Sequence, residues 1–93
     1  MITCHESVGD YALVDCGAYV GTFMLAARSL GVACIAQAAL ATRAAAVRAH
    51  FGLPADQRVV CGISFGYADE AHPVNVNRLP RADLAEVVTW VGT

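Results

Sequence analysis

The longest hydrophobic stretch of the chain covers residues 11–30, and apolar side chains surround nearly the whole circumference of a helix drawn through it. A thin polar line interrupts this surface at three residues spaced seven apart, Asp15, Thr22 and Ser29. Ser7 or Asp10 is placed to cap the first turn, and Gly31 follows the last turn, where glycine tolerates left-handed backbone. The pattern predicts a long helix over residues 11–30 that is buried on several sides.

Two glycines, Gly17 and Gly21, lie four residues apart within this predicted helix. Each interior glycine destabilises a helix by about 1 kcal/mol relative to alanine, so the close approach of another element is the expected compensation. The same spacing marks dimer faces between membrane-spanning helices. A spanning helix, however, needs about 20 mostly apolar residues without a central charge, whereas Asp15 interrupts this stretch and Arg28 closes it. We therefore interpret the glycine pair as a site of tight core packing and expect no membrane partner.

A second apolar stripe predicts a helix over residues 42–51, with Gly52 and Pro54 as stop signals. Residues 58–67 alternate between two sets of side chains that are both apolar or small, which is typical of a central strand covered on both faces. Gly62 and Gly66 share one face of this strand and leave room for a helix, a backbone segment or a ligand. A frayed strand is expected at residues 1–5, and a short extended segment or turn at residues 32–36.

The composition of the chain changes after Asp69. Residues 70–81 are polar and contain two prolines and two asparagines, which predicts an extended arm. A short helix over residues 82–90 is expected to follow. The predicted order is therefore strand, long helix, second helix, central strand and arm.

Composition limits the size and partners of the fold. The 93 residues are 57% hydrophobic and only 15% charged, whereas soluble domains are about 45–50% apolar and about 25% charged. One domain is the upper limit at this length, and a small monomer cannot bury so much apolar surface. All six basic residues are scattered arginines, so the basic stripe of a nucleic-acid-binding protein is missing. The chain opens without a secretion signal, and we expect a cytoplasmic protein.

The four cysteines, at positions 4, 16, 34 and 61, form no CxxC pair. In an apolar chain without a secretion signal they are predicted to be buried free thiols rather than disulfides. Cys4 and His5 are adjacent, but no second pair has chelating spacing, so no metal site is predicted. No nucleophile and base can be paired from their spacing either, and no catalytic side chain is predicted.

Two arginines, Arg78 and Arg81, follow the asparagine-containing part of the arm. Guanidinium groups three residues apart can hold one phosphate through bidentate hydrogen bonds. From the spacing alone, a solvated pair on the surface is the favoured interpretation. The residues alone leave both interpretations open.

From Asp15 onward, a series of short segments occurs in a recognisable order. They are Asp15-Cys-Gly, Met24-Leu-Ala-Ala-Arg28, Leu30-Gly31, Gln37-Ala-Ala-Leu40, Val60-Cys-Gly-Ile-Ser-Phe-Gly-Tyr-Ala-Asp69, His72-Pro-Val-Asn75 and Arg78-x-x-Arg81. In order and spacing this resembles the C-terminal part of the FMN-dependent nitroreductase family, especially the branch similar to nitrobenzoate nitroreductases. The resemblance implies an α+β fold of nitroreductase type and a homodimeric flavoenzyme. Such enzymes pass electrons from NAD(P)H through FMN to a nitroaromatic, a quinone or a similar acceptor.

The resemblance also implies roles for particular residues. Gln37, Ala38 and Ala39 match the turn that lies against the isoalloxazine ring, and Arg78 and Arg81 match the residues that hold the FMN phosphate. The long helix resembles the family's central dimer helix. One of the family's further arginines is replaced here by valine or asparagine at residues 76–77.

The arginine- and serine-rich segment with which the family begins has no counterpart in this sequence. Residues 1–93 are therefore expected to be the C-terminal portion of a single nitroreductase-like domain, with its N-terminal half absent.

Two hypotheses from different classes remain. In the first, the chain is an FMN-dependent oxidoreductase, or a truncated remnant of one, in which the cofactor performs the chemistry and the protein tunes it. In the second, it is a non-catalytic assembly module that packs against another chain. Either hypothesis predicts a partner, which is a second copy or the missing N-terminal half.

Overall fold

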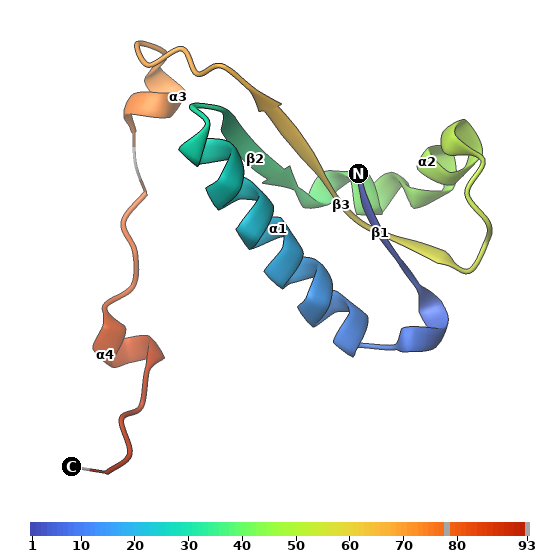
Figure 1. Cartoon of the computed structure of the whole chain (residues 1–93), viewed down its shortest axis with the longest axis horizontal. Helices are drawn as coiled ribbons and strands as arrows, with labels where there is room; N and C mark the ends of the chain where they lie inside the picture. The colour runs from blue at the N-terminus through green and yellow to red at the C-terminus, as the bar shows by residue number, and fades with distance from the viewer. Residues whose placement is uncertain (78, 93) are drawn as a thin grey trace.

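The computed structural model describes residues 1–77 and 79–92, in nine elements (Figure 1). The strands are β1 (Ile2–His5), β2 (Ala33–Gln37) and β3 (Gln57–Gly66). The α-helices are α1 (Tyr11–Ser29), α2 (Ala44–Phe51), α3 (Pro73–Val76) and α4 (Leu84–Val87). Two 3-10 segments, Glu6–Val8 and Ala38–Arg43, lead into α1 and α2.

Strand β3 is the centre of a three-stranded antiparallel sheet with the order β1-β3-β2. Its first half pairs with β1, where Ile2 lies opposite Cys61, and its second half pairs with β2, where Ala33 lies opposite Gly66. Helix α1 lies along the sheet and contacts all three strands (Figure 1). The predicted central strand is confirmed, and the segment expected as a strand or turn is the edge strand β2.

The two faces of the sheet are covered by different elements. Cys61 lies on the face of α1, close to Cys16. Neighbouring strand residues point to opposite faces, so Gly62 faces away from α1, and there it meets the side chain of Leu40. The close approach expected at Gly62 is thus confirmed. Beyond Gly62 this face of the sheet is no longer covered, and the residues of β3 from Ser64 onward are exposed.

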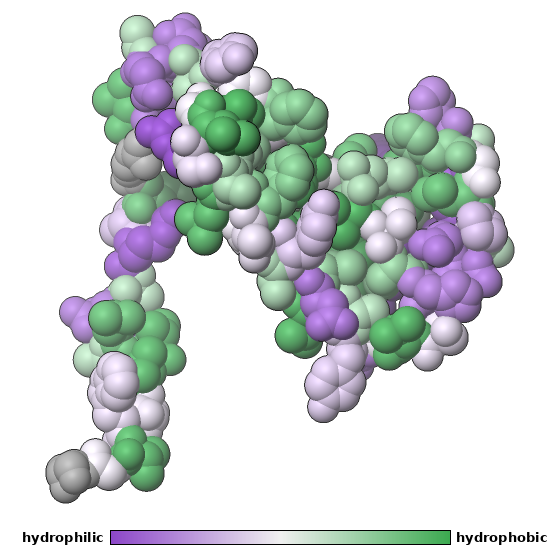
Figure 2. Space-filling model, in the orientation of Figure 1, coloured by the Kyte–Doolittle hydropathy of each residue, from purple (hydrophilic) through white to green (hydrophobic). Residues whose placement is uncertain are grey.

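The core is small for a chain of this composition. The buried hydrophobic residues are Ala12, Cys16, Val47, Val59 and Cys61. Helix α1 forms where it was predicted, but several of its large apolar side chains are exposed, including Tyr11 at 81% and Leu25 at 75%. Figure 2 shows hydrophobic residues interspersed with polar ones over the face turned to the viewer. Among the described residues, no helix is both long and apolar enough to cross a membrane.

Both ends of α1 test the capping prediction. Gly31 has a φ of 76°, as expected of a glycine after a helix. Asp10 occupies the N-cap position, but its side chain makes no capping hydrogen bond. Ser7 lies in the preceding 3-10 turn, where its hydroxyl is 2.7 Å from Nδ1 of His5. The prediction of a side-chain cap is wrong, because this local bond occupies Ser7 before the helix begins.

The interpretation of Gly17 and Gly21 as a site of tight packing is also wrong for this chain by itself. Apart from the adjacent residues and the backbone of α1 itself, no atom among residues 1–77 and 79–92 lies within 4 Å of the position that a Cβ would occupy at either glycine. Any element that approaches them must therefore come from outside the described residues.

The C-terminal region differs from the prediction in two places. The expected extended arm contains the single-turn helix α3, whose N-cap His72 accepts a hydrogen bond at Nδ1 from the Val74 N–H, at 3.3 Å. The helix expected over residues 82–90 is reduced to α4. Isolated short helices are unstable without a packed face, and after α3 the chain runs away from the sheet (Figure 1).

All four cysteines are free, and the prediction of free thiols is confirmed. Cys16 and Cys61 are buried, whereas Cys4 and Cys34 are only partly buried. Burial raises the pKa of the Cys16 thiol, and the neighbouring Cys4 thiol, which is hydrogen-bonded to it, raises that pKa further. The thiols on β1, α1 and β3 thus form part of the packed core.

Replacing Gly62 with alanine should destabilise the fold, because the new methyl group would collide with the Leu40 side chain. Overpacking of this kind costs about 1–3 kcal/mol of the free energy of unfolding. Gly66→Ala is the matched control, since nothing lies within 4 Å of its Cβ position. Urea denaturation measures both variants, and adding Leu40→Ala should make the Gly62→Ala penalty smaller. Equal free energies of unfolding for the two glycine variants would contradict this account.

Cys16 should react more slowly with iodoacetamide than Cys34 in the folded protein at pH 8. The thiolate is the reactive species, and a raised pKa together with burial leaves less of it accessible at Cys16. Mass spectrometry of the alkylated peptides measures the two rates. In urea, where burial is lost, the difference between the two cysteines should disappear. Native rates that are equal would show that Cys16 is not protected by the fold.

Candidate functional site

The turn after β2 brings together the first three predicted site residues. β2 ends at Gln37, and the 3-10 segment begins with Ala38 and Ala39. All three residues are exposed. The Gln37 side chain is fixed in place, because its Oε1 accepts a hydrogen bond of 3.0 Å from the Ser64 hydroxyl. The two small alanine side chains leave the backbone of the turn open to a flat group.

The sheet face turned away from α1 continues this surface. Beyond Gly62, which Leu40 covers, two cross-strand pairs form it: Ile35 with Ser64, and Ala33 with Gly66. The side chains that β3 contributes here are short, so the surface beside Ile35 is open. It is a suitable floor for a planar aromatic ring.

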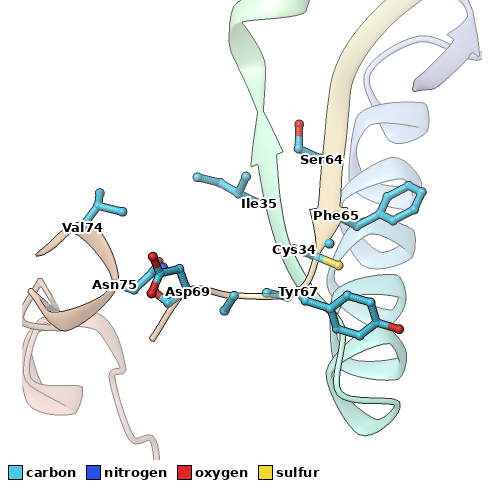
Figure 3. A pocket seen from close by; sticks show the side chains of 11 residues that line it. Cys34, Ile35, Ser64, Phe65, Tyr67, Asp69, Val74 and Asn75 are labelled. Atoms are coloured by element: carbon cyan, nitrogen blue, oxygen red, sulfur yellow. The ribbon is translucent and has the colours of Figure 1, made fainter. Parts of the chain in front are cut away.

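A cavity of about 450 Å³ opens over the end of this floor (Figure 3). Ile35 and Ser64 line it from β2 and β3, and Val74 and Asn75 line it from the α3 region. In Figure 3, Tyr67 and Phe65 point toward the α1 side of the sheet. Phe65 packs edge-on against Phe23 of α1, with ring centroids 6.4 Å apart.

A second cavity of about 410 Å³ shares part of its lining with the first one. The shared residues are Ala33, Ile35, Ala68, Val74 and Asn75. Its other lining residues are polar: Arg28, Glu70, Asn77 and Arg81. We call the two connected cavities the groove. The groove therefore runs from Ser64, which is bonded to Gln37, to a charged end that contains two arginines.

Of the predicted residues, Arg81 lines the charged end of the groove. Gln37, Ala38 and Ala39 do not line either cavity, and Gln37 is connected to the groove through its hydrogen bond with Ser64. Arg78 lies outside the described residues. Sequence reasoning missed Ser64 and Arg28. Ser64 carries no signal until the register of β2 on β3 is known, and Arg28 lies far from Arg81 along the chain.

A groove with small and apolar residues at one end and arginines at the other suits an amphipathic ligand with a ring and an anionic group. FMN has this form, so the residues present fit the cofactor that the resemblance implied. The described residues offer no comparable site for a metal ion, because no three of their His, Cys, Asp or Glu side chains are grouped as ligands.

Comparison with known proteins identifies the family of the chain. A profile described as the nitroreductase family matches residues 5–67, which include both β2 and β3. The chain is 41% identical over 80 residues to a 4-nitrobenzoate reductase of Nocardioides sp. (strain LMS-CY), a match that covers 86% of this chain and 32% of that protein. It is 46% identical over 76 residues to the nitroreductase NfnB of Mycolicibacterium smegmatis, covering 82% and 32%.

Solved structures of similar proteins have the same fold. The FMN and NADPH-dependent nitroreductase NfnB from sphigopyxis sp. strain HMH superposes with a TM-score of 0.93 at 36% identity, covering 98% of this chain and 41% of that one. The α+β fold of nitroreductase type is thus confirmed. The chain spans about a third of the length of the curated relatives it matches. Over that third, sequence and fold agree, and the chain belongs to the nitroreductase family.

Proposed function

We propose that this chain is the flavin-contacting, C-terminal portion of a single nitroreductase-like domain in an FMN-dependent oxidoreductase. The complete enzyme would pass electrons from NAD(P)H to a nitroaromatic, a quinone or a similar acceptor. The observation that carries the proposal is the groove, which leads from Ser64, hydrogen-bonded to Gln37 of the turn after β2, to Arg81. Its solved relatives include nitroreductases described as dependent on FMN and NADPH.

The residues of the groove have distinct tasks in this proposal. The small side chains of Ala38 and Ala39 let the ring approach the backbone, and the Ser64 hydroxyl holds Gln37 in a fixed orientation. Arg81, together with Arg78 of the same motif, would bind the phosphate. When bound, FMN supplies the hydride chemistry, so no side chain of this chain is required as an acid or a base.

A partner is a necessary part of the proposal. Large apolar side chains of α1 and the C-terminal region are exposed, among them Leu25 and Trp90. The matched relatives are about three times longer than this chain, so they contain elements that can cover such surfaces. We infer that α1 packs against the rest of the nitroreductase fold or against a second copy. The same surfaces would serve a non-catalytic assembly module, and flavin binding distinguishes the two hypotheses.

Titration with FMN should quench flavin fluorescence, and Ala38→Phe should weaken this binding at least about tenfold, since the ring would collide with the new side chain. Ala38 is exposed, so the free energy of unfolding should change by no more than about 0.5 kcal/mol. Ala45→Phe, at an exposed alanine of α2, is the matched control and should change neither quantity. Absence of quenching by the unsubstituted chain would favour the assembly module. Equal affinities of the two variants would remove the turn from the site.

Light scattering should give a mass above the 9.7 kDa of one chain. Exposed apolar patches of this extent drive association in water. A compact monomer that melts cooperatively would contradict the need for a partner. Sedimentation at several concentrations separates a defined dimer from open-ended aggregation.

A further inference from the structure

We propose that Ser7, His5 and Asp56 form a hydrolytic site for small, uncharged carboxylic esters. Ser7 is the nucleophile, His5 is the general base and Asp56 is a positioning residue. The site lies near the N-terminal ends of α1 and β3, whereas the groove lies near their C-terminal ends (Figure 1). The inference is therefore independent of the proposed function, and no flavin takes part in it.

Two short contacts connect the three side chains in series. Oγ of Ser7 lies 2.7 Å from Nδ1 of His5, and Nε2 of the same ring lies 2.9 Å from Oδ2 of Asp56. A hydroxyl, an imidazole and a carboxylate connected in this order can activate a serine for acyl transfer. Spacing in the sequence could not show this arrangement, because Asp56 lies far along the chain from the other two residues.

A third hydrogen bond decides which ring nitrogen of His5 carries the proton. The backbone N–H of Ser7, which can only donate, lies 3.2 Å from Nδ1. In the neutral ring Nδ1 is therefore the acceptor, and the proton is on Nε2, where it faces the Asp56 carboxylate. The Ser7 hydroxyl accordingly donates to Nδ1, so the nitrogen that takes its proton in the reaction is already its partner.

The backbone holds Asp56 beside the ring. The Glu6 N–H donates a hydrogen bond of 2.9 Å to the Asp56 carbonyl. The next residue, Gln57, pairs with His5 in the sheet formed by β1 and β3. The side chains of His5 and Asp56 are exposed to 46% and 54%, and an exposed ion pair alone would order them only weakly. These backbone contacts on both sides of the pair keep the carboxylate and the ring together.

His5 also has a structural role, because it caps the 3-10 segment Glu6–Val8. The hydrogen bond from the Ser7 N–H is sufficient for that cap. The cap requires neither the Ser7 hydroxyl on Nδ1 nor a carboxylate on Nε2, yet both are present. These two additional contacts are the ones that a general base needs.

The cavity beside His5 limits the class of substrate. It has a volume of about 330 Å³, and its lining includes two acids, Glu6 and Asp10, and one cation, Arg58. Ser7 does not line this cavity, but it follows Glu6, which does, and it is exposed. An ester can therefore reach the Ser7 hydroxyl from solvent. The excess of acidic groups disfavours a substrate with an anionic group.

The reaction is an acyl transfer in two steps. Ser7 Oγ attacks the carbonyl carbon of the ester as its proton moves to His5 Nδ1, and the departing alcohol takes that proton when the ester C–O bond breaks. Water then attacks the acyl-serine and gives a proton to Nδ1, and Ser7 Oγ regains this proton as the carboxylic acid leaves. Asp56 orients the ring and stabilises the imidazolium in both steps, and nothing is oxidised or reduced.

The test uses the 93-residue chain and two probes, turnover of 4-nitrophenyl acetate and covalent labelling by diisopropyl fluorophosphate, which mass spectrometry should locate on Ser7. Ser7→Ala should abolish the labelling and lower the rate of hydrolysis above that of buffer about a hundredfold. His5→Asn should lower both rates to the same extent, although asparagine keeps an acceptor for the Ser7 N–H and so preserves the cap. His50→Gln, at an exposed histidine of α2, is the control and should change neither quantity.

The role of Asp56 has its own readout. Asp56→Asn should lower kcat at least about tenfold and leave KM unchanged, because the carboxylate acts through His5 and does not touch the ester. Asp56→Glu, which keeps the charge, should restore part of the lost kcat.

Three results would overturn the proposal. The first is label or turnover that survives in Ser7→Ala, and the second is an equal loss in His5→Asn and His50→Gln, which would indicate hydrolysis by imidazole groups in general. The third is full activity of Asp56→Asn, since the carboxylate would then have no part in the site. In each case His5 would be a capping residue only.

Discussion

Both edges of β3 are hydrogen-bonded, and the other parts of the structure take their positions from this pairing. On one edge, the register with β2 brings Gln37 beside Gly62 and allows its side chain to reach Ser64. On the other edge, β1 carries Cys4 to Cys16 of α1. A shift of one residue would turn every side chain of β2 to the opposite face and would remove the floor of the groove. The register is therefore as important to the site as the residues themselves.

The second constraint is the amount of chain available. A sheet of three strands can be covered on one face by α1 and only partly on the other by the 3-10 segment around Leu40. The exposed half of β3 carries the groove floor, so the absence of cover there is what makes the site accessible. The exposed side of α1 leaves large apolar residues such as Leu25 facing solvent. The short length of the chain thus explains why a sequence with so high a hydrophobic content has so small a core.

Sequence patterns predicted the elements best where local chemistry decides them. Gly31 and Gly52 end α1 and α2 in left-handed backbone, and the alternation in β3 predicted its burial correctly as far as Gly62. The patterns did not predict features that depend on contacts between residues far apart in the sequence. The packing expected at Gly17 and Gly21 depends on elements that the described residues do not contain. Arg28 could not be found because the fold alone brings it to Arg81. Homodimer formation, the electron acceptor and a cytoplasmic location stay predictions.

The pairing of β1 with β3 also sets the order in which the chain can fold. Ile2 bonds opposite Cys61, so β1 leaves the ribosome long before its partner strand exists. Helix α1 needs only local contacts and can form during this interval, with its apolar surface still uncovered. Closing so long a loop is entropically costly and slow. We therefore expect nascent chains to require protection by a chaperone until β3 has emerged. Substitutions that weaken β3 should reduce the yield of folded protein by more than their effect on the free energy of unfolding would suggest.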